Sequence, residues 1–461
     1  MRILLFIFAL FGLEIAASAA NLCVSVSSSG GADGSDWNNA LAASFTPVRG
    51  NTYYLADGSY SSKTWSVAAS SSTLITIKKA TATDHVTETG WSSTMGDGQS
   101  IFSAMTVSTS DWLFDGQAGG GPTNAFGHGI LITNTAGDLF TFSNVITNIT
   151  IRHFHLTSNR GGGLDDGTTF LAAIKATTGG TRNLTVSRCS ITDIFGPPFH
   201  ISNITNGVFE YLYVARNRST PSWHSEMVSS INNNFDLTWR WSIYDQIEGT
   251  AVFAGINTGL SDGWKIYGNV FTRSVTPIYY YCEPPGSNQQ LMTNSYCLNN
   301  TIYNQAINSI GNWNIQNGGT NFAYNNLYFT NDANSWFNSM TADYDWASYN
   351  IRSADGPFDK DSEVLTSEAN GIDGSSAAPF VRYNPDPLTA DLSLAITIAA
   401  GTNTASMVES NSWDMWGNLR TTNTWQRGAF QAGVPAVAST IYRGFQFGSG
   451  VKLIGPGSIR Q

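Results

Sequence analysis

The chain has 461 residues, with 23 Lys and Arg against 33 Asp and Glu, and a formal net charge of −10 at neutral pH. Only 12% of the residues are charged, whereas 41% are hydrophobic and 12% aromatic, which excludes an intrinsically disordered chain. The acidic balance also argues against nucleic acid as a partner, because a nucleic-acid footprint needs a basic face.

Residues 1–20 have the pattern of a secretory signal peptide. Arg2 is followed by an apolar run over residues 3–13 and by small residues at 16–20, so we expect cleavage after Ala19 or Ala20. The apolar run is too short to span a bilayer, and no later stretch is long enough. We therefore expect a secreted protein, extracellular or periplasmic, without a membrane span.

A short unit of alternating apolar and polar residues recurs along the chain. Gap-free copies begin at Asn148, Asn183, Asp236 and Gly263, and each has Asn, Cys, Ser or Phe as its seventh residue. Weaker copies cover residues 294–302, 320–328 and the surroundings of 350, and a blurred copy falls near 211–217. The copies recur at steps of roughly 24 to 35 residues, a period that indicates a solenoid.

The units of this solenoid are predicted to be strands, because apolar residues alternate and Gly, Asn, Asp and Ser separate the copies. Helical repeats would need apolar residues at three- and four-residue spacing. We expect coils of two or three short strands, each coil adding about 4.8 Å along one axis. Asn269, Asn300, Asn326 and Asn350 would then stack at inward turns as a hydrogen-bonded asparagine ladder.

The segments that open and close the repeat region resemble a known class of proteins. Residues 34–40, 49–60 and 75–78 are similar to the first coils of secreted right-handed parallel β-helix proteins, the pectate-lyase-like superfamily. Residues 414–420 and 428–430 are similar to the closing segment of the same superfamily. The resemblance implies an all-β fold, a right-handed parallel β-helix, and it says little about chemistry.

The expected organisation follows from this resemblance and from the repeats. An N-terminal cap with the first coils covers residues 21–110, and the parallel β-helix coils cover 111–355. Residues 356–461 carry several prolines and few repeat matches, so an irregular C-terminal extension or cap is expected there. Caps are needed because an open end would expose strand edges to aggregation.

The centre of the chain is similar in layout to the alginate and chondroitin lyases of the β-helix class. In those enzymes a Glu-x-apolar-Ser-x-Lys-Ser strand is followed, a coil later, by an Arg-His-Gly strand. Glu226 starts the matching segment and corresponds to an acidic residue near their calcium site, so Ca2+ is the metal that the resemblance implies, while no cofactor is required. Their catalytic lysine position falls on Ile231 and their arginine position near residues 253–254, so neither cation is matched.

His224, Glu226 and Glu248 are the candidate catalytic residues. Alternate residues of a strand share one face, so His224 and Glu226 would lie about 6–7 Å apart, with Glu248 brought near by a stacked coil. Two carboxylates in one groove can divide the acid and base roles of glycoside hydrolysis, and His224 can act as a general base. The alternative is that Glu226 caps a turn or binds structural calcium and that His224 is a surface residue.

Neighbouring coils supply candidate substrate-binding residues, because cations suit acidic groups and aromatic rings suit sugar faces. These candidates are Trp223, His200, Arg240, Lys265, Tyr267 and Tyr280. The alternative for His200 is a histidine in a loop after Pro197 and Pro198. Arg216 and Arg218 fit either contact with anionic sugars or a solvated turn. Trp239 and Trp264 fall on inward positions and are expected in the core.

The four cysteines are Cys23, Cys189, Cys282 and Cys297. In an oxidising compartment, Cys282 and Cys297 can form a disulfide across a short loop. The alternative is that Cys189 and Cys297 are small buried hydrophobic residues. None of the spacings suits zinc.

These features predict a secreted carbohydrate-active protein that cleaves an extracellular polysaccharide, either as a lyase or as a glycoside hydrolase. The rival interpretation is a non-catalytic cell-surface or polysaccharide-binding β-helix, which the unmatched lysine and arginine favour. Both interpretations make a polysaccharide the expected partner.

Overall fold

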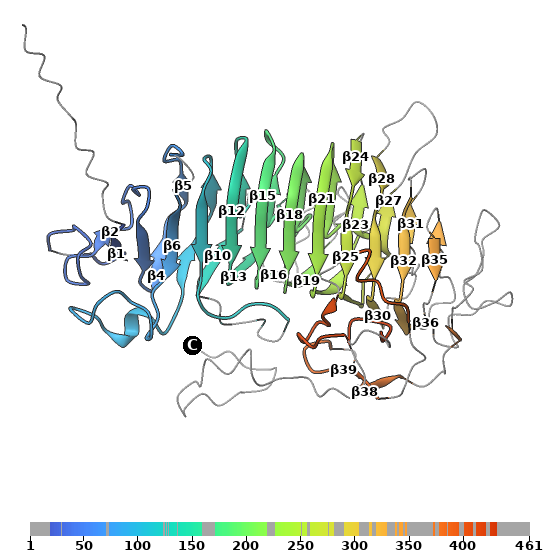
Figure 1. Cartoon of the computed structure of the whole chain (residues 1–461). Helices are drawn as coiled ribbons and strands as arrows, with labels where there is room; N and C mark the ends of the chain where they lie inside the picture. Colours follow the sequence, from blue (N-terminus) through green and yellow to red (C-terminus); the bar gives the residue numbers. More distant parts are fainter. Residues whose placement is uncertain are drawn as a thin grey trace, which may run out of the picture.

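The computed structural model describes a chain that winds into a long solenoid (Figure 1). The described residues are 19–28, 30–70, 73–122, 125, 127, 129–135, 137–158, 171–218, 226–249, 251–255, 259–274, 276–280, 290–303, 313–315, 320–329, 337–338, 341–343, 346–347, 372–373, 378–384, 386–395, 401–408, 412–420 and 425–430. Most of the predicted signal peptide, residues 1–18, lies outside this part.

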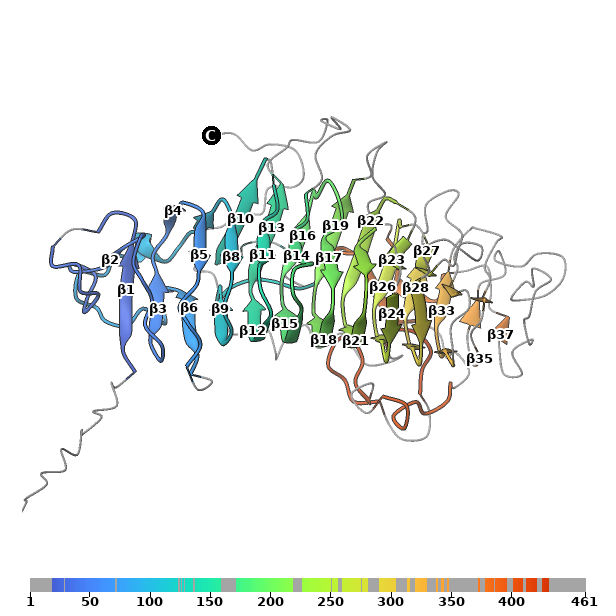
Figure 2. The same cartoon turned by 90° about the horizontal axis from the view of Figure 1, so that it is seen from above.

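Three parallel sheets, called A, B and C here, form the walls of the solenoid (Figures 1 and 2). A typical coil passes through all three, as β12, β13 and β14 do, and the next coil stacks β15, β16 and β17 on them. The fold is therefore a right-handed parallel β-helix, and the predicted fold class is confirmed.

The strands have the following bounds. Sheet A contains β1 (Asn21–Ser25), β2 (Leu41–Ala42), β3 (Thr52–Leu55), β6 (Ile75–Lys79), β9 (Trp112–Asp115), β12 (Ile146–Arg152), β15 (Thr181–Ser187), β18 (Ile204–Glu210), β21 (Asn234–Arg240), β24 (Gly259–Asp262), β25 (Lys265–Tyr267), β28 (Gln290–Thr293), β29 (Tyr296–Leu298), β32 (Phe322–Tyr324) and β35 (Thr341–Asp343). Sheet B contains β4 (Gly58–Tyr60), β7 (Ser100–Phe102), β10 (Ile130–Asn134), β13 (Phe154–Ser158), β16 (Ser190–Thr192), β19 (Tyr213–Asn217), β22 (Ile243–Ile247), β26 (Val270–Thr272), β30 (Thr301–Tyr303), β33 (Leu327–Phe329), β36 (Trp346–Ala347) and β37 (Ile372–Asp373). Sheet C contains β5 (Lys63–Trp65), β8 (Met105–Val107), β11 (Phe140–Phe142), β14 (Ile174–Ala176), β17 (Phe199–Ser202), β20 (Val228–Ile231), β23 (Ala251–Gly255), β27 (Thr276–Tyr280), β31 (Trp313–Ile315) and β34 (Phe337–Asn338). A separate antiparallel pair joins β38 (Phe380–Arg382) to β39 (Asp391–Leu394), and the 3-10 helix η1 covers Ser93–Met95.

The register of sheet A matches the sequence repeat. Ile149 pairs with Leu184, and Thr238 pairs with Lys265, so the copies that begin at 148, 183, 236 and 263 stack as predicted. The blurred copy near 211–217 was placed too late: Leu184 pairs with Gly207, so that copy begins at residue 206. This copy is hard to recognise in the sequence because Gly207 stands where the other copies have an apolar residue.

The absence of a side chain at Gly207 has a steric reason. A Cβ atom there would lie 2.9 Å from Leu237 Cδ2 and 2.9 Å from Phe209 Cε2. Phe209 stacks on Trp239 of the next coil with ring centroids 3.8 Å apart, and this aromatic pair fills the interior. Trp239 and Trp264 are both fully buried, which confirms their predicted place in the core.

An asparagine ladder runs inside the turn between sheets A and B. Asn269 Nδ2 donates to Asn300 Oδ1 at 3.2 Å, and Asn300 Nδ2 donates to Asn326 Oδ1 at 3.0 Å. All three side chains are buried, so the ladder satisfies polar groups that would otherwise be costly. The predicted ladder is confirmed for these residues, and Asn350 lies outside the described part.

The C-terminal extension packs on the outer face of sheet B. Phe380, Leu392 and Phe430 share one apolar cluster with Tyr213 and Ile243 of the sheet. Phe380 of β38 lies 5.8 Å from Tyr303 of β30 and 5.9 Å from Phe329 of β33, between ring centroids, on the side of the solenoid where Figure 1 shows β38 and β39. No helix within the described residues has the length and hydrophobicity of a membrane span.

Candidate functional site

The structure distributes the predicted site residues over three sheets. Arg240 ends β21, and Lys265 and Tyr267 bound β25, all in sheet A. His200 lies on β17 and Tyr280 ends β27, both in sheet C. Trp223 and His224 lie outside the described residues, so the pairing of His224 with Glu226 stays a prediction.

Arg240 and Tyr267 belong to a polar cluster at the corner between sheets A and B. Arg240 donates to Glu210 Oε2 through Nε at 2.8 Å and through Nη2 at 2.5 Å, and its Nη1 bonds to the Tyr267 hydroxyl at 2.9 Å. The guanidinium also lies 4.1 Å from the ring centroid of Trp241, and Tyr267 is fully buried. These bonds connect neighbouring coils of the solenoid.

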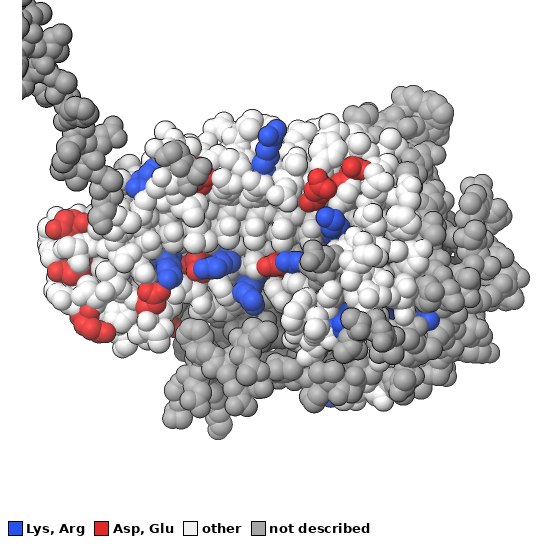
Figure 3. Space-filling model, viewed as in Figure 1, with Lys and Arg blue, Asp and Glu red and all other residues white. Residues whose placement is uncertain are grey.

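The outer face of sheet A carries little charge along its middle. Figure 3 shows charged side chains in rows along the borders of this face, with an uncharged band between them. Outward residues of the band include Thr76, Thr150, Thr185 and Thr238, which occupy one register position in their strands. Lys265 follows at the same position on the next coil. An anionic polymer would find few cations on this band.

Titratable groups of complementary chemistry lie together on the outer face of sheet C. Lys175 of β14 pairs in register with His200 of β17, and His200 pairs with Ser229 of β20. Successive residues of a strand face opposite sides, and the flanking Ile174 and Phe199 are buried in the core. Lys175 and His200 therefore point outward on adjacent coils, with Ser229 beyond them; we call these three residues the sheet C column.

The surroundings of His200 in the sheet C column favour its neutral form. Lys175 Nζ forms an ion pair with Asp138 Oδ2 at 2.8 Å, and Asp138 Oδ1 accepts the amide of Ala172 at 2.9 Å. Burial and, second, the positive charge of Lys175 lower the pKa of His200 to about 4. At neutral pH the column therefore presents a neutral imidazole beside the ion pair of Lys175 and Asp138.

The two predicted carboxylates lie in the connections between sheets B and C. Glu226 comes shortly before β20 and is buried, with 3% of the residue exposed. Glu248 directly follows β22 in the next coil, where its Oε1 accepts Arg218 Nη1 at 2.7 Å. Glu248 is thus engaged by a cation, whereas Glu226 lies in the same coil as Ser229 of the sheet C column.

This arrangement has a chemical capability that the sequence repeat did not reveal. A neutral imidazole can accept a proton, and a neighbouring ammonium can neutralise the carboxylate of an acidic sugar. Asp138 and Lys175 were not among the predicted site residues. Sheet C strands follow connections of variable length, so the repeat template did not extend to Lys175.

The positions that hold cations in the resembling lyases lack them here. Ile231 ends β20, and Ala254 pairs with Ser229 as the next outward residue on sheet C. Ala254 is buried, with 2% exposed. Lys175 and His200 lie instead on the two coils that precede Ser229 in sheet C.

The described cysteines, Cys23, Cys189 and Cys297, are all buried. Cys189 is buried as a free thiol, and desolvation raises its pKa to about 12. Cys297 is buried on β29, and Cys282 lies outside the described residues, so the predicted disulfide stays a prediction. Within the described part, no three His, Cys, Asp or Glu side chains gather as a metal site would require. Calcium near Glu226 also stays a prediction.

No protein-family model matches the chain, and no curated protein matches it. Among solved structures it is similar to pectate lyase Pel9A, with 17% identity, a TM-score of 0.45, and coverage of 90% of this chain and 97% of that one. It is similar to the PL6 family polysaccharide lyase Pedsa3628 from Pseudopedobacter saltans, with 11% identity, a TM-score of 0.39, and coverage of 76% and 91%. It is also similar to the PL6 family alginate lyase AlyGC, with 10% identity, a TM-score of 0.33, and coverage of 79% and 54%. The fold assignment rests on the three parallel sheets themselves.

Proposed function

We propose that the chain is a secreted carbohydrate-active β-helix that cleaves an extracellular acidic polysaccharide on the outer face of sheet C. The observation that supports this most directly is the register of Lys175 and His200, which sets a cation beside a neutral base. Glu226, close in the same region, is the candidate for an acidic role. His224 keeps its predicted role as a second candidate base.

The chemistry best suited to these groups is elimination. Lys175 binds the carboxylate of a uronic acid sugar, which makes the adjacent C–H more acidic. His200 takes that proton, the C–H electron pair forms a carbon–carbon double bond, and the glycosidic oxygen leaves with a proton returned by the imidazolium. The bound carboxylate offsets the charge of Lys175, one cause of the low His200 pKa, so the imidazole becomes more basic when substrate binds.

The test is to incubate the purified protein with uronate-containing and neutral polysaccharides. New reducing ends accompanied by ultraviolet absorbance from unsaturated ends indicate a lyase, and reducing ends alone indicate a hydrolase. We expect unsaturated ends from acidic polymers, lost in Lys175→Met and His200→Asn and kept in Arg182→Gln, a control on sheet A. Retained activity in both sheet C variants would remove the assignment, and loss only in Glu226→Gln would favour hydrolysis.

A second function is a non-catalytic polysaccharide-binding β-helix. It is favoured by Ile231 and Ala254, which stand without a charge at the positions where the resembling lyases hold their catalytic cations. In this case, the same incubation gives no product, while the protein is retained on an immobilised acidic polysaccharide. Retention that depends on Lys175, without any turnover, would support this second function.

A further inference from the structure

A column of polar residues follows the corner where the chain leaves sheet B. The register of β16, β19, β22 and β26 places Asp193, Arg216, Gln246 and Arg273 at one position on four successive coils. We call these four residues the corner column. Their φ angles are 57°, 55°, 53° and 47°, a left-handed conformation that bulky residues seldom adopt. The corner therefore fixes four long or polar side chains in a repeated backbone geometry.

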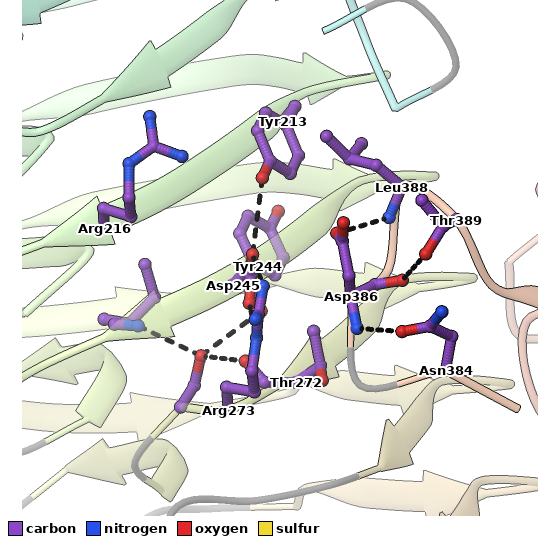
Figure 4. Close-up of polar contacts among 12 residues, drawn as sticks. Tyr213, Arg216, Tyr244, Asp245, Thr272, Arg273, Asn384, Asp386, Leu388 and Thr389 are labelled. Carbon is purple, nitrogen blue, oxygen red and sulfur yellow. Dashed lines mark hydrogen bonds and ion pairs between the residues drawn. The ribbon is translucent and has the colours of Figure 1, made fainter. Parts of the chain in front are cut away.

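The two arginines of the corner column are held in the same way. Arg216 donates through Nε and Nη2 to Asp193, both at 2.7 Å. Arg273 donates through Nε at 2.7 Å and Nη2 at 2.6 Å to Asp245, as Figure 4 shows. Each arginine thus binds an aspartate of the preceding coil through the Nε–Nη2 edge of its guanidinium.

Within the described part of the chain, no hydrogen bond engages the other edge of either guanidinium. A guanidinium has five N–H donors, and these bidentate pairs use only Nε and Nη2. Among the described residues, Nη1 of Arg216 and of Arg273 has no hydrogen-bond partner. Their side chains are 31% and 28% exposed. The aspartates therefore orient two partly exposed arginines, and the Nη1 donors of both guanidinium groups are not used in these pairs.

Gln246 separates the two arginines within the column. Its register partners are Arg216 on one side and Arg273 on the other, so the arginines lie two coils apart, roughly 9.6 Å at the spacing of parallel strands. The Gln246 side chain is partly exposed and makes no hydrogen bond within the described residues. From Asp193 onward, the column thus presents a carboxylate, a guanidinium paired with it, a neutral amide and a second guanidinium.

We propose that the corner column binds an acidic polysaccharide in which charged sugars alternate with uncharged ones. An extended chain along the solenoid axis would place about one sugar on each coil, with acidic sugars at Arg216 and Arg273 and a neutral sugar at Gln246. This inference rests on the proposed function in taking a polysaccharide as the ligand. It adds the charge pattern of that polysaccharide and a binding row apart from the sheet C column.

Carboxylate and sulfate groups both suit an arginine edge, because each accepts parallel N–H bonds. The probes therefore distinguish carboxylate from sulfate. Hyaluronan carries a carboxylate on alternate sugars and no sulfate, whereas chondroitin sulfate carries both groups. Polygalacturonate has a carboxylate on every sugar, and dextran has none. The direct measurement is binding of size-matched oligosaccharides of each polymer by titration calorimetry.

We expect the wild-type protein to bind hyaluronan oligosaccharides more tightly than polygalacturonate oligosaccharides and not to bind dextran. Arg216→Gln should weaken hyaluronan binding about tenfold, the value of one charge-assisted hydrogen bond. Gln246→Arg should shift the preference toward polygalacturonate, because a cation would then face every sugar. Gln246 makes no hydrogen bond within the described part, so this variant tests the proposal without breaking an ion pair. Arg182→Gln on sheet A is the matched control and should bind like wild type.

Several outcomes would overturn the inference. Equal binding of alternating and uniform polymers, or a preference unchanged by Gln246→Arg, would exclude the charge pattern. If chondroitin sulfate binds more tightly than hyaluronan and Arg216→Gln does not weaken this binding, sulfate is recognised at a site other than the corner column. If the polymers are cleaved or bound in a Lys175-dependent way while both corner variants behave like wild type, only this inference fails. If no polysaccharide is bound or cleaved, the proposed function fails with it.

Discussion

Asn300 donates from Nδ2 to the backbone carbonyl of Ile266 at 3.0 Å, and its Oδ1 accepts the backbone amide of Asn269 at 3.1 Å. One side chain therefore satisfies backbone groups of the preceding coil while it continues the ladder to Asn326. The turn between sheets A and B can stay buried only because of such bonds.

Replacing Asn300 with Ala should destabilise the protein. The substitution leaves a buried donor on Asn269 and a buried acceptor on Ile266 without partners, at about 1–3 kcal/mol for each. Chemical denaturation followed by circular dichroism measures the loss. The matched control is Asn183→Gly, because the Asn183 side chain is exposed and water can replace its bond to Asn148. Equal losses in the two variants would contradict the prediction.

Introducing a side chain at Gly207 should also destabilise the fold. In Gly207→Val, the added Cβ would lie only 2.9 Å from side-chain atoms of Leu237 and Phe209, in an interior already filled by stacked rings. Overpacking of this kind costs about 1–3 kcal/mol. Val208→Thr on the outward side of the same strand is the control, and thermal unfolding of the two variants gives the comparison. An unchanged melting temperature in Gly207→Val would refute the steric reason for this glycine.

The sequence predicted the path through sheets A and B well, because a corner of two residues joins the sheet A strand to the sheet B strand in successive coils, as between β21 and β22 and between β25 and β26. Asn269 and Asn300 therefore fell in register without any structural information. Sheet C follows connections of variable length, so Lys175 could not be assigned to the coil of His200 from the repeat. The Arg216–Asp193 pair could not be predicted either, because it depends on a left-handed backbone conformation at the corner that no local sequence pattern indicates.

The pKa of His200 should respond to the removal of Lys175. Burial is the larger cause of the low value and Lys175 the second, so Lys175→Met should raise the pKa above about 4 while keeping it below the ordinary 6.5. NMR titration of the imidazole, assigned with His200→Asn, measures the change. Arg182→Gln should leave the titration where it is. An unaltered pKa in Lys175→Met would show that the two side chains are not electrostatically coupled.

Removing the charge of Asp386 should strengthen binding at the corner column. Asp386, on the C-terminal extension, acts electrostatically on Asp245 and Arg273, and Figure 4 shows it on their side of sheet B. Its Oδ1 accepts the Leu388 amide, a turn that asparagine also supports. Asp386→Asn should tighten hyaluronan binding roughly two- to fivefold, as for a partly exposed charge pair. Calorimetry at two salt concentrations provides the control, because the gain should shrink at high salt.

The stability of the N-terminal coils should rise in alkaline solution because of Lys63. Its ammonium group bonds to the carbonyls of Ala43 and Phe45 at 2.9 and 2.8 Å and lies 4.3 Å from the Phe45 ring centroid. Burial lowers the pKa of Lys63 from 10.5 to about 8. Between these values the unfolded chain holds a proton that the folded chain has released, so the free energy of unfolding increases as pH rises from about 8 to 10.5.

The measurement for Lys63 is urea denaturation across this pH range, compared with Lys63→Met. Other lysines and tyrosines titrate in the same window, and the difference between the two proteins isolates the contribution of Lys63. Wild type should gain stability relative to the variant as pH increases. A difference that stays constant from pH 8 to 10.5 would mean that Lys63 titrates alike in the folded and unfolded chains, and that the two carbonyls and the aromatic ring compensate its burial.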